Sequence, residues 1–356
     1  MTAAPRATPA TAAPPSAARV PRLGFLGVGW IGRQRMAALA ASGAGRVAAL
    51  VDPAADNLRL AQAVAPDARV LDSAAALAES DLDGIVIATP SALHADQATA
   101  ALERGKAVFC QKPLARSAAE TRRVVAAARA ADRLLAVDFS YRFAEAMRRV
   151  AAGVRAGEIG RPYAAELVFH NAYGPDKAWC YDPALAGGGC LMDLGVHLVD
   201  LAFWVLDDAS VGSIAARLFA DGEPVGDGSR VVEDFAVAQF DVGPAAARLA
   251  CSWRLPAGRE AIIEATFYGT RGALSFRNVA GSFYDFAADR FDGTRTERLV
   301  NPPDAWGGRA LVDWAERVAA GEGFDPSAER LVAVAETLDG IYQAGRAADP
   351  GARRPA

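Results

Sequence analysis

The chain has 356 residues, of which 52% are hydrophobic and 22% charged, and its formal net charge at pH 7 is −4. This length allows two domains with substantial cores, and the composition is that of an ordinary globular protein. A weakly acidic chain without a block of Lys and Arg argues against nucleic acid as a partner, because phosphate recognition needs clustered positive charge.

Residues 1–20 are rich in Ala, Pro and Thr and contain no apolar core segment. They are therefore predicted to form a disordered tail rather than a signal peptide. No apolar run approaches the length of a membrane span, so we expect no membrane partner. The cysteines are scattered and form no C-x-x-C pair, which argues against a zinc knuckle or a disulfide framework and fits a cytoplasmic protein: Cys110, Cys180, Cys190 and Cys251.

A short apolar strand predicted at residues 23–26 runs directly into a G-x-G-x-x-G motif at residues 27–32. A helical pattern follows, and a second strand at 46–51 ends at Asp52, twenty residues after the last glycine of the motif. Strand, glycine motif, helix, strand and acid in this order are typical of a dinucleotide-binding β-α-β unit, a far more specific signal than the glycine motif alone.

Each residue of this motif has a physical role in such a unit. Gly27 permits the tight turn, Gly29 lets the backbone approach the pyrophosphate, and Gly32 lets the helix pack closely on the strand. Asp52 is expected to accept hydrogen bonds from the adenosine ribose, and a carboxylate there repels a 2′-phosphate, so NAD is favoured over NADP. The loop residues expected to bind the cofactor are Gly27, Gly29, Trp30, Ile31 and Gly32.

The α/β alternation continues through further predicted strands at about 70–71, 84–89, 107–110 and 134–139, each separated from the next by a helical segment. The strand at 84–89 is apolar, as a strand buried on both faces of a parallel sheet must be. Six strands with intervening helices predict an α/β domain over residues 21–140, a doubly wound parallel sheet of the Rossmann type.

The strand at 107–110 ends in Gln111-Lys112-Pro113. Ligands of doubly wound sheets bind beyond the carboxyl ends of the strands, so Lys112 is expected beside the cofactor. Taken alone, Lys112 would more commonly be a solvated loop lysine.

A second candidate site lies at 187–200, where three glycines precede a helical pattern that runs to residue 204. Asp193 and His197 are four residues apart and would share one face of such a helix. A carboxylate beside an imidazole can hold a general base in the right tautomer, but the same pair could be a metal half-site or a surface capping interaction. Asp200 could add a metal ligand, yet no cysteine or further histidine completes a set, so no metal is expected.

After residue 140 a helix is predicted to about 155, followed by alternating patterns that predict many strands. They predict an α+β domain over 141–347 with a large, mostly antiparallel sheet open on one face. The predicted strands lie at 163–169, 211–219, 232–240, 248–253, 261–268 and 272–276.

Three stretches together resemble the Gfo/Idh/MocA family of nicotinamide-dependent oxidoreductases, whose members include inositol and glucose–fructose enzymes. They are the 27–32 motif with Asp52, the run Thr89-Pro90…His94…Gly105-Lys106…Lys112-Pro113, and the run Gly187-Gly188-Gly189…Asp193-Leu194-Gly195-Val196-His197…Asp200. Their order and spacing match over most of residues 22–345, and the combination is specific to the family but not to one substrate. The family usually has Glu-Lys-Pro where this chain has Gln111-Lys112-Pro113.

The resemblance implies a set of site residues. The catalytic residues would be Lys112, Asp193 and His197. Thr89, Pro90, His94, Gln111 and Lys112 would join the glycine motif and Asp52 around NAD, with His94 either beside the cofactor or structural. Weaker substrate candidates are Arg142, His170, Asn171, Tyr173 and Trp179, the last of which could instead be core or lid packing.

For the reaction itself, oxidation of an alcohol requires a proton acceptor beside the hydride acceptor. His197 would be the general base, Asp193 its orienting partner, and Lys112 would hydrogen-bond the reacting oxygen. An alternative gives the proton-relay role to Lys112, and the sequence does not separate the two.

The predicted function is an NAD-dependent dehydrogenase that oxidises a secondary ring hydroxyl of a cyclic polyol, sugar or sugar-containing small molecule to a ketone, of the inositol or aminoglycoside- and sugar-biosynthesis type. One alternative is an NAD-bound glycoside hydrolase of the same family, in which the nicotinamide is recycled within a turnover. Another is a non-catalytic dinucleotide-sensing protein. The resemblance also implies a homodimer or homotetramer formed through the open face of the second sheet.

Overall fold

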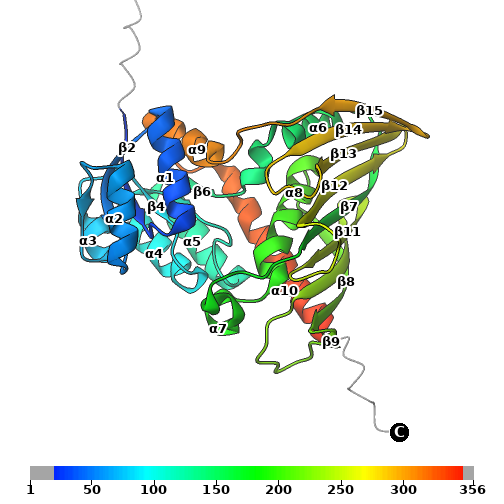
Figure 1. Cartoon of the computed structure of the whole chain (residues 1–356), viewed down its shortest axis with the longest axis horizontal. Helices are drawn as coiled ribbons and strands as arrows, with labels where there is room; N and C mark the ends of the chain where they lie inside the picture. Colours follow the sequence, from blue (N-terminus) through cyan, green and yellow to red (C-terminus); the bar gives the residue numbers. More distant parts are fainter. Residues whose placement is uncertain (1–19, 348–356) are drawn as a thin grey trace, which may run out of the picture.

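The structure of the protein is a computed structural model that describes residues 20–347, so the predicted tail lies outside the described residues except for its last residue. The chain forms two lobes, one around a parallel sheet and the other around a much larger sheet (Figure 1). Both the doubly wound α/β sheet and the large second sheet predicted from the sequence are present.

The first sheet has six strands in the order β3-β2-β1-β4-β5-β6, and all of its strand pairs are parallel. The order reverses between β1 and β4, and in such sheets the crevice at this reversal is where dinucleotides bind. The strands are β1 (Arg22–Leu26), β2 (Arg46–Val51), β3 (Arg69–Val70), β4 (Gly84–Ile87), β5 (Ala107–Cys110) and β6 (Leu135–Val137).

Helices cover both faces of this sheet, as strands buried on both sides require. The helices that connect its strands are α1 (Trp30–Ser42), α2 (Ala55–Val64), α3 (Ala74–Glu79), α4 (Ser91–Glu103) and α5 (Ala118–Ala131). A further helix, α9 (Arg309–Ala319), returns from the far end of the chain and lies beside α1 (Figure 1). Its Trp314 is 1% exposed and packs on Phe109 of β5, with ring centroids 5.8 Å apart.

The second sheet has nine strands in the order β15-β14-β13-β12-β7-β11-β10-β8-β9. Only β7 and β11 pair in parallel; the other neighbours are antiparallel. The strands are β7 (Pro162–Asn171), β8 (Val211–Ala220), β9 (Glu223–Pro224), β10 (Phe235–Val242), β11 (Ala245–Ser252), β12 (Ala261–Gly269), β13 (Gly272–Asn278), β14 (Phe286–Asp292) and β15 (Arg295–Val300). The sequence did not predict β9, β14 or β15.

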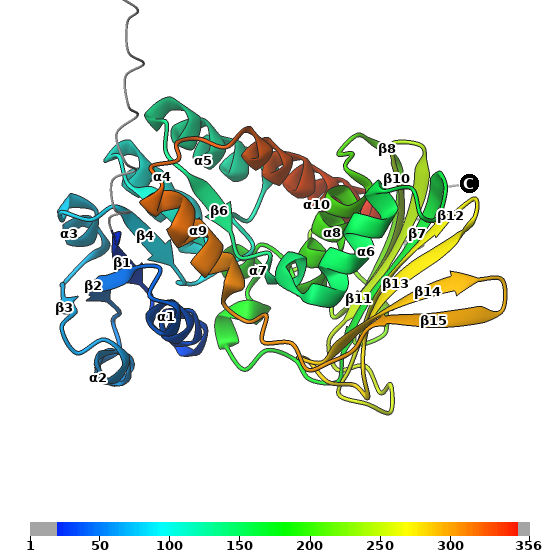
Figure 2. The same ribbon diagram turned by 90° about the horizontal axis from the view of Figure 1, so that it is seen from above.

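One face of the large sheet is covered by α6 (Glu145–Arg155), α8 (Val196–Leu206) and α10 (Glu329–Ala347), which lie between it and the first domain (Figure 2). The other face carries no helix of the described residues. Successive side chains of a strand point to opposite faces. Along β7, Leu167 and Phe169 are buried under the helices, whereas Glu166, Val168 and His170 alternate with them and face the open side.

The stretch 183–206 is where the structure departs from two predictions. Instead of one regular helix from residue 191, it has a short α7 (Pro183–Ala186), a π-helical turn at Leu191–Gly195, and then α8. It is also long and apolar enough to cross a membrane, contrary to expectation. However, 83% of its most apolar 18-residue segment is buried inside the protein. There α8 contacts α6, α10 and β7, so the apolar composition is that of a buried core helix.

Short 3₁₀ turns complete the described fold, at Ser140–Phe143, Ala178–Tyr181 and Pro326–Ala328. The first leads the chain out of β6 into the second domain. The second lies in the loop that follows β7.

Candidate active site

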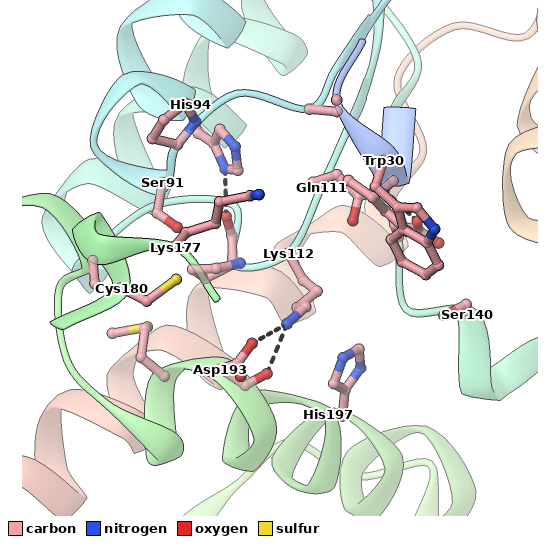
Figure 3. Close-up of a pocket in the computed structure, with 18 of the residues that line it drawn as sticks. Trp30, Ser91, His94, Gln111, Lys112, Ser140, Lys177, Cys180, Asp193 and His197 are labelled. Atoms are coloured by element: carbon pink, nitrogen blue, oxygen red, sulfur yellow. Dashed lines mark hydrogen bonds and ion pairs between the residues drawn. The ribbon is translucent and has the colours of Figure 1, made fainter. Parts of the chain in front are cut away.

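A cavity of about 610 Å³ lies between the two domains (Figure 3). From the first domain it is lined by the glycine motif, the start of α1 and the segments that follow β4, β5 and β6. From the second domain it is lined by the π-helical turn, Trp253 at the end of β11, and the loops around Lys177, Tyr284 and Trp306. Parallel strands therefore direct their carboxyl ends into it, as in other doubly wound sheets.

The glycine motif has the geometry that a dinucleotide needs. Gly27 has a φ of +87°, and a Cβ on it would come within 2.5 Å of Ala88 O. A Cβ on Gly32 would lie 2.3 Å from Gly27 O, so α1 can approach the loop this closely only without a side chain. A Cβ on Gly29 would meet no atom within 4 Å, because this residue borders the open cavity. The first turn of α1, beginning at Trp30, offers its free N–H groups at the same edge.

Asp52 ties the glycine motif to the second strand. Its Oδ2 accepts a hydrogen bond from Val28 N at 2.8 Å, and its Oδ1 accepts from Ala54 N at 2.9 Å and from Asn57 Nδ2 at 3.1 Å. These bonds fix the carboxylate at the end of β2, beyond the cavity and on the side where an adenosine ribose would lie. A carboxylate has about four accepting positions, so Asp52 keeps capacity for a further donor.

His94 is 1% exposed and bridges two loops. Its Nδ1 lies 2.8 Å from Pro113 O and its Nε2 lies 2.7 Å from Thr89 O. Burial lowers the pKa of His94, while the two carbonyl acceptors oppose that shift. The ring therefore lies between the segments after β4 and β5 at the cavity wall, with a backbone carbonyl facing each of its nitrogens.

Lys112 and Asp193 form an ion pair across the two domains (Figure 3). The Lys112 ammonium donates to Asp193 Oδ1 at 2.5 Å and to Asp193 O at 2.9 Å. The other carboxylate oxygen, Oδ2, accepts from Trp253 Nε1 at 3.0 Å. Asp193 is thus fixed by a lysine of the first domain and a tryptophan of the second.

The expected pairing of Asp193 with His197 is wrong. Among the described residues, Asp193 receives its side-chain hydrogen bonds from Lys112 and Trp253, and none joins it to His197. The prediction assumed a regular α-helix, in which residues four apart stack on one face. The backbone instead makes an i→i+5 bond from Val196 N to Leu191 O, and the two carboxylate oxygens of Asp193 are engaged by Lys112 and Trp253.

His197 stands at the cavity wall with only 7% of its surface exposed. Its ring packs edge-on against Tyr141, with centroids 4.9 Å apart, and against Phe139 at 6.0 Å. Burial lowers the pKa of His197 well below its ordinary value, and the positive charges of Lys112 and Arg35 lower it further. The imidazole is therefore neutral near pH 7 and able to accept a proton.

Several wall residues were not singled out from the sequence. Trp306 stacks on Tyr141 at 5.3 Å and donates from its Nε1 to Tyr284 O at 2.9 Å, which sets both aromatic groups at one side of the cavity. Arg35 and Asp138 pair at another side. An acid directly after an apolar strand, as Asp138 is, is a signal that could have been noticed; the aromatic loop residues give no comparable local signal.

Two family models match the chain. The one described as "Oxidoreductase family, NAD-binding Rossmann fold" matches residues 21–139, and the one described as "GFO/IDH/MocA C-terminal domain" matches residues 147–275. The chain belongs to the GFO/IDH/MocA family of oxidoreductases. Its first domain is accordingly the NAD-binding Rossmann domain of that family.

The chain is also similar to individual proteins of the GFO/IDH/MocA family. The chain is 34% identical over 199 residues to inositol 2-dehydrogenase 3 of Saccharopolyspora erythraea, covering 55% of this chain and 56% of that protein. It is 28% identical over 296 residues to D-apiose dehydrogenase of Paraburkholderia graminis, covering 82% and 74%. The chain spans about half the length of several curated relatives that it matches.

Among solved structures, the chain resembles KijD10, a 3-ketoreductase from Actinomadura kijaniata in complex with NADP and TDP-benzene. The TM-score is 0.78 at 23% identity, covering 92% of this chain and 98% of that one. This similarity shows that the two-domain fold is shared.

The cofactor residues implied by the GFO/IDH/MocA resemblance largely meet at the cavity. Gly27, Gly32 and Asp52 do not line it; they shape the glycine loop through close backbone contacts and a hydrogen bond to Val28 N. The others line it: Gly29, Trp30, Ile31, Thr89, Pro90, His94, Gln111 and Lys112.

Of the predicted substrate residues, Trp179 lines the cavity and the other four do not. Trp179 lines the cavity together with Asp176 and Lys177. Asn171 accepts from Tyr173 N at 2.8 Å in a local turn, and Tyr173 is 53% exposed; neither lines the cavity.

Arg142 and His170 lie away from the cavity for separate reasons. Arg142 makes a two-pronged ion pair with Asp200, which is 1% exposed, so Asp200 is its buried structural partner. His170 faces the open side of the large sheet, where its Nδ1 lies 2.8 Å from Ser252 Oγ and its ring stacks on Phe235. Within the described residues, no group of three His, Cys, Asp or Glu side chains is arranged to hold a metal.

Proposed function

We propose that the protein is an NAD-dependent dehydrogenase that oxidises a secondary ring hydroxyl of a cyclic polyol, sugar or sugar-containing small molecule to a ketone. One observation carries the proposal: Lys112 of the first domain and His197 of the second line the same cavity, beside the glycine motif. A proton acceptor and a cation would therefore lie beside the nicotinamide of bound NAD.

Removal of a hydride from an alcohol carbon requires the hydroxyl proton to leave as well. His197 is neutral, and no other side chain of the described residues hydrogen-bonds its ring, so it is free to accept that proton. NAD, when bound, supplies the hydride acceptor. The aromatic groups around His197 limit how far the ring can rotate.

Lys112 is suited to stabilise the charge that develops on the oxygen. An ammonium has three donors. Two of them are used by Asp193, through its Oδ1 and its backbone oxygen, so one remains for the substrate. Asp193 aims the lysine and balances its charge, and Trp253 holds Asp193 in turn.

A proton relay through Lys112 is the second assignment. Such a relay would break the ion pair with Asp193 whenever the ammonium gave up its proton. No comparable bond of His197 would be lost when it accepts one, which favours His197 as the base.

The cavity wall fits a neutral, hydroxyl-rich substrate. Its charged side chains occur as opposite pairs: Lys112 with Asp193, Arg35 with Asp138, and Lys177 with Asp176. Aromatic side chains, which offer broad apolar surface to the C–H faces of a ring, make up much of the remaining wall. They are Trp30, Tyr141, Trp179, Trp253, Phe283, Tyr284 and Trp306. The inositol and apiose dehydrogenases among the relatives support the same class.

A screen of the purified protein with NAD against inositols, aldoses and aminoglycosides tests the proposal. We expect NADH to form in amounts equal to the ketone produced. Glycoside cleavage without net NADH would replace the proposal by the NAD-bound hydrolase alternative. NADH binding without turnover of any candidate would replace it by the dinucleotide-sensing alternative.

We further propose a homodimer or homotetramer in the cytoplasm. The open face of the large sheet supports an interface, because it is not covered by any helix of the described residues. Light scattering of the purified protein tests the assembly, and a monomer at micromolar concentration would contradict it.

A further inference from the structure

The glycine-rich turn before α8 is held by a buried glutamate. Glu233 lies just before β10 and is 2% exposed. Its carboxyl oxygens accept hydrogen bonds from Gly189 N at 3.0 Å and from Leu191 N at 2.9 Å. Its backbone oxygen accepts from Cys190 N at 2.9 Å. One residue therefore satisfies three consecutive N–H groups where this helical segment begins.

We propose that Glu233 is a positioning residue for the reaction: by holding the start of this turn, it places the Asp193 carboxylate for its ion pair with Lys112. Glu233 is not among the residues that line the cavity, so it acts through Asp193 and not on the substrate. The inference rests on the proposed function only in taking Lys112 and Asp193 as part of the active site.

A short chain of hydrogen bonds links Glu233 to Asp193. Gly189 donates its N–H to Glu233 and accepts at its own backbone oxygen from Asp193 N, at 3.0 Å. Asp193 in turn accepts from the Lys112 ammonium through Oδ1 and through its backbone oxygen. A displacement of Gly189 would therefore move both oxygens that hold the lysine.

Two glycines of this turn make the close approach of Glu233 possible. A Cβ on Gly189 would overlap the backbone oxygen of Glu233, and a Cβ on Gly188 would overlap the hydroxyl of Tyr342. Tyr342, on α10, donates that hydroxyl to Glu233 Oε1 at 2.8 Å. The groups that hold the turn thus exclude side chains at these two positions, which gives the glycines a reason apart from the cofactor.

The turn also supplies the charge balance of a buried acid. Burial raises the pKa of Glu233, whereas the hydrogen bonds from Leu191, Tyr342 and Gly189 favour the charged form and oppose that rise. Free N–H groups at the start of a helix stabilise a carboxylate in the same way. Acid and turn therefore stabilise each other, and removal of the carboxylate would leave buried donors unpaired.

Glu233→Gln tests the inference, with Tyr342→Phe as the matched control. Gly189 N lies 3.0 Å from both carboxyl oxygens, so the amide nitrogen would face a second donor in either orientation. We expect kcat to fall about tenfold, because small displacements of catalytic groups are costly, with NADH affinity within about twofold of wild type. Tyr342→Phe removes a bond to the same carboxyl but none to the turn, so its kcat should stay within about threefold of wild type.

The indole N–H of Trp253 gives a readout that needs no substrate, since it donates to Asp193 Oδ2 at 3.0 Å. The chain has six tryptophans, and Trp253→Phe identifies the indole NMR signal of Trp253 among them. This signal should shift in Glu233→Gln, whereas that of Trp314, buried in the first domain, should not. If no substrate is found, the proposed function fails, but the Trp253 signal still decides the inference.

A double variant separates positioning from a general loss of stability. In an Asp193→Asn background, Glu233→Gln should lower kcat by less than about threefold, because it acts through Asp193. The full tenfold loss in that background, an unmoved Trp253 signal, or an equal loss of kcat in Tyr342→Phe would each overturn the inference. Should Glu233→Gln fail to fold, Glu233→Asp, which keeps the acid but shortens its reach, takes its place with the same expected outcomes.

Discussion

The Nζ atom of Lys112 lies 2.5 Å from Oδ1 of Asp193, although the two residues are 81 positions apart and belong to different domains. Their side chains are 21% and 36% exposed, so the pair is at the cavity and not on the outer surface. The same contact that fixes the lysine also joins the two walls between which a substrate would sit. The proposed chemistry therefore depends on an ion pair that also crosses between the domains.

Lys112→Met should lower kcat by about 10²–10³-fold, the usual loss when one donor to a developing oxyanion is removed. NADH affinity should change little, because the lysine acts on the substrate oxygen. Steady-state kinetics and an NADH titration measure the two effects. Lys106→Met is the matched control, since Lys106 precedes β5 at the end far from the cavity. An unchanged kcat in Lys112→Met would contradict the assignment.

Asp193 should be coupled to Lys112 and independent of His197. We expect Asp193→Asn to lower kcat, and to add little further loss in a Lys112→Met background, because the two residues act as one unit. Combined with His197→Ala, its effect should be nearly additive. Strong coupling to His197 and none to Lys112 would restore the pairing that the sequence suggested.

His197→Ala should lower kcat/KM by about 10²–10⁴-fold, the range for loss of a general base. The base works only in its neutral form, so activity falls as pH drops through its pKa. Because burial and neighbouring cations lower the pKa of His197, the acid limb of wild-type kcat/KM should lie well below the value of about 6.5 for an ordinary histidine. The limb should vanish in the variant. A wild-type limb near pH 6.5, or full activity of His197→Ala across pH 6–9, would count against this base.

His170→Ala is the histidine control for that experiment. His170 faces the open side of the large sheet, so its removal should leave kcat/KM within about threefold of wild type.

Asp52→Ala should weaken NAD binding about tenfold and narrow the preference for NAD over NADP. Part of the effect comes through the glycine motif, because Asp52 also accepts from Val28 N. Titration with both cofactors measures the preference, with Asp56→Ala as control, since Asp56 is exposed and its one ion pair within the described residues is with Arg59. Unchanged affinity and preference would refute the role of Asp52.

Arg142→Met should destabilise the protein by about 3–5 kcal/mol, because it leaves the buried Asp200 without a partner. Burial already raises the pKa of Asp200, and Arg142 opposes that shift. Chemical denaturation measures the loss. The fraction that remains folded should keep its KM. An increase in KM without a loss of stability would instead support the predicted role of Arg142 in substrate binding.

The first domain could be predicted well from the sequence because the patterns that indicate it are local. The spacing from Gly27 to Asp52 and the apolar strand before Thr89 each follow from the backbone around them. Strands β14 and β15 were missed because charged residues interrupt their apolar pattern, as in the segment Arg295–Val300.

The site was harder to predict, since its contacts join distant parts of the chain. The spacing of Asp193 and His197 is visible in the sequence, but neither the π turn nor the competition from Lys112 and Trp253 is. His170 shows a different kind of error. The predicted strand stopped at residue 169, whereas β7 continues to Asn171 and turns His170 toward the open face by simple alternation.

The return of α9 to the first sheet limits how this chain can be divided. Trp314 fills the space left by Gly84, where a Cβ would lie 2.6 Å from the indole, and it covers Phe109. A fragment that ended near residue 140 would uncover this apolar surface and would tend to aggregate. A chimera that exchanges the cofactor-binding domain between related enzymes must therefore exchange α9 together with residues 21–139. A chimera with a single crossover near residue 140 should fail to fold, whereas one that also exchanges the segment of α9 should succeed.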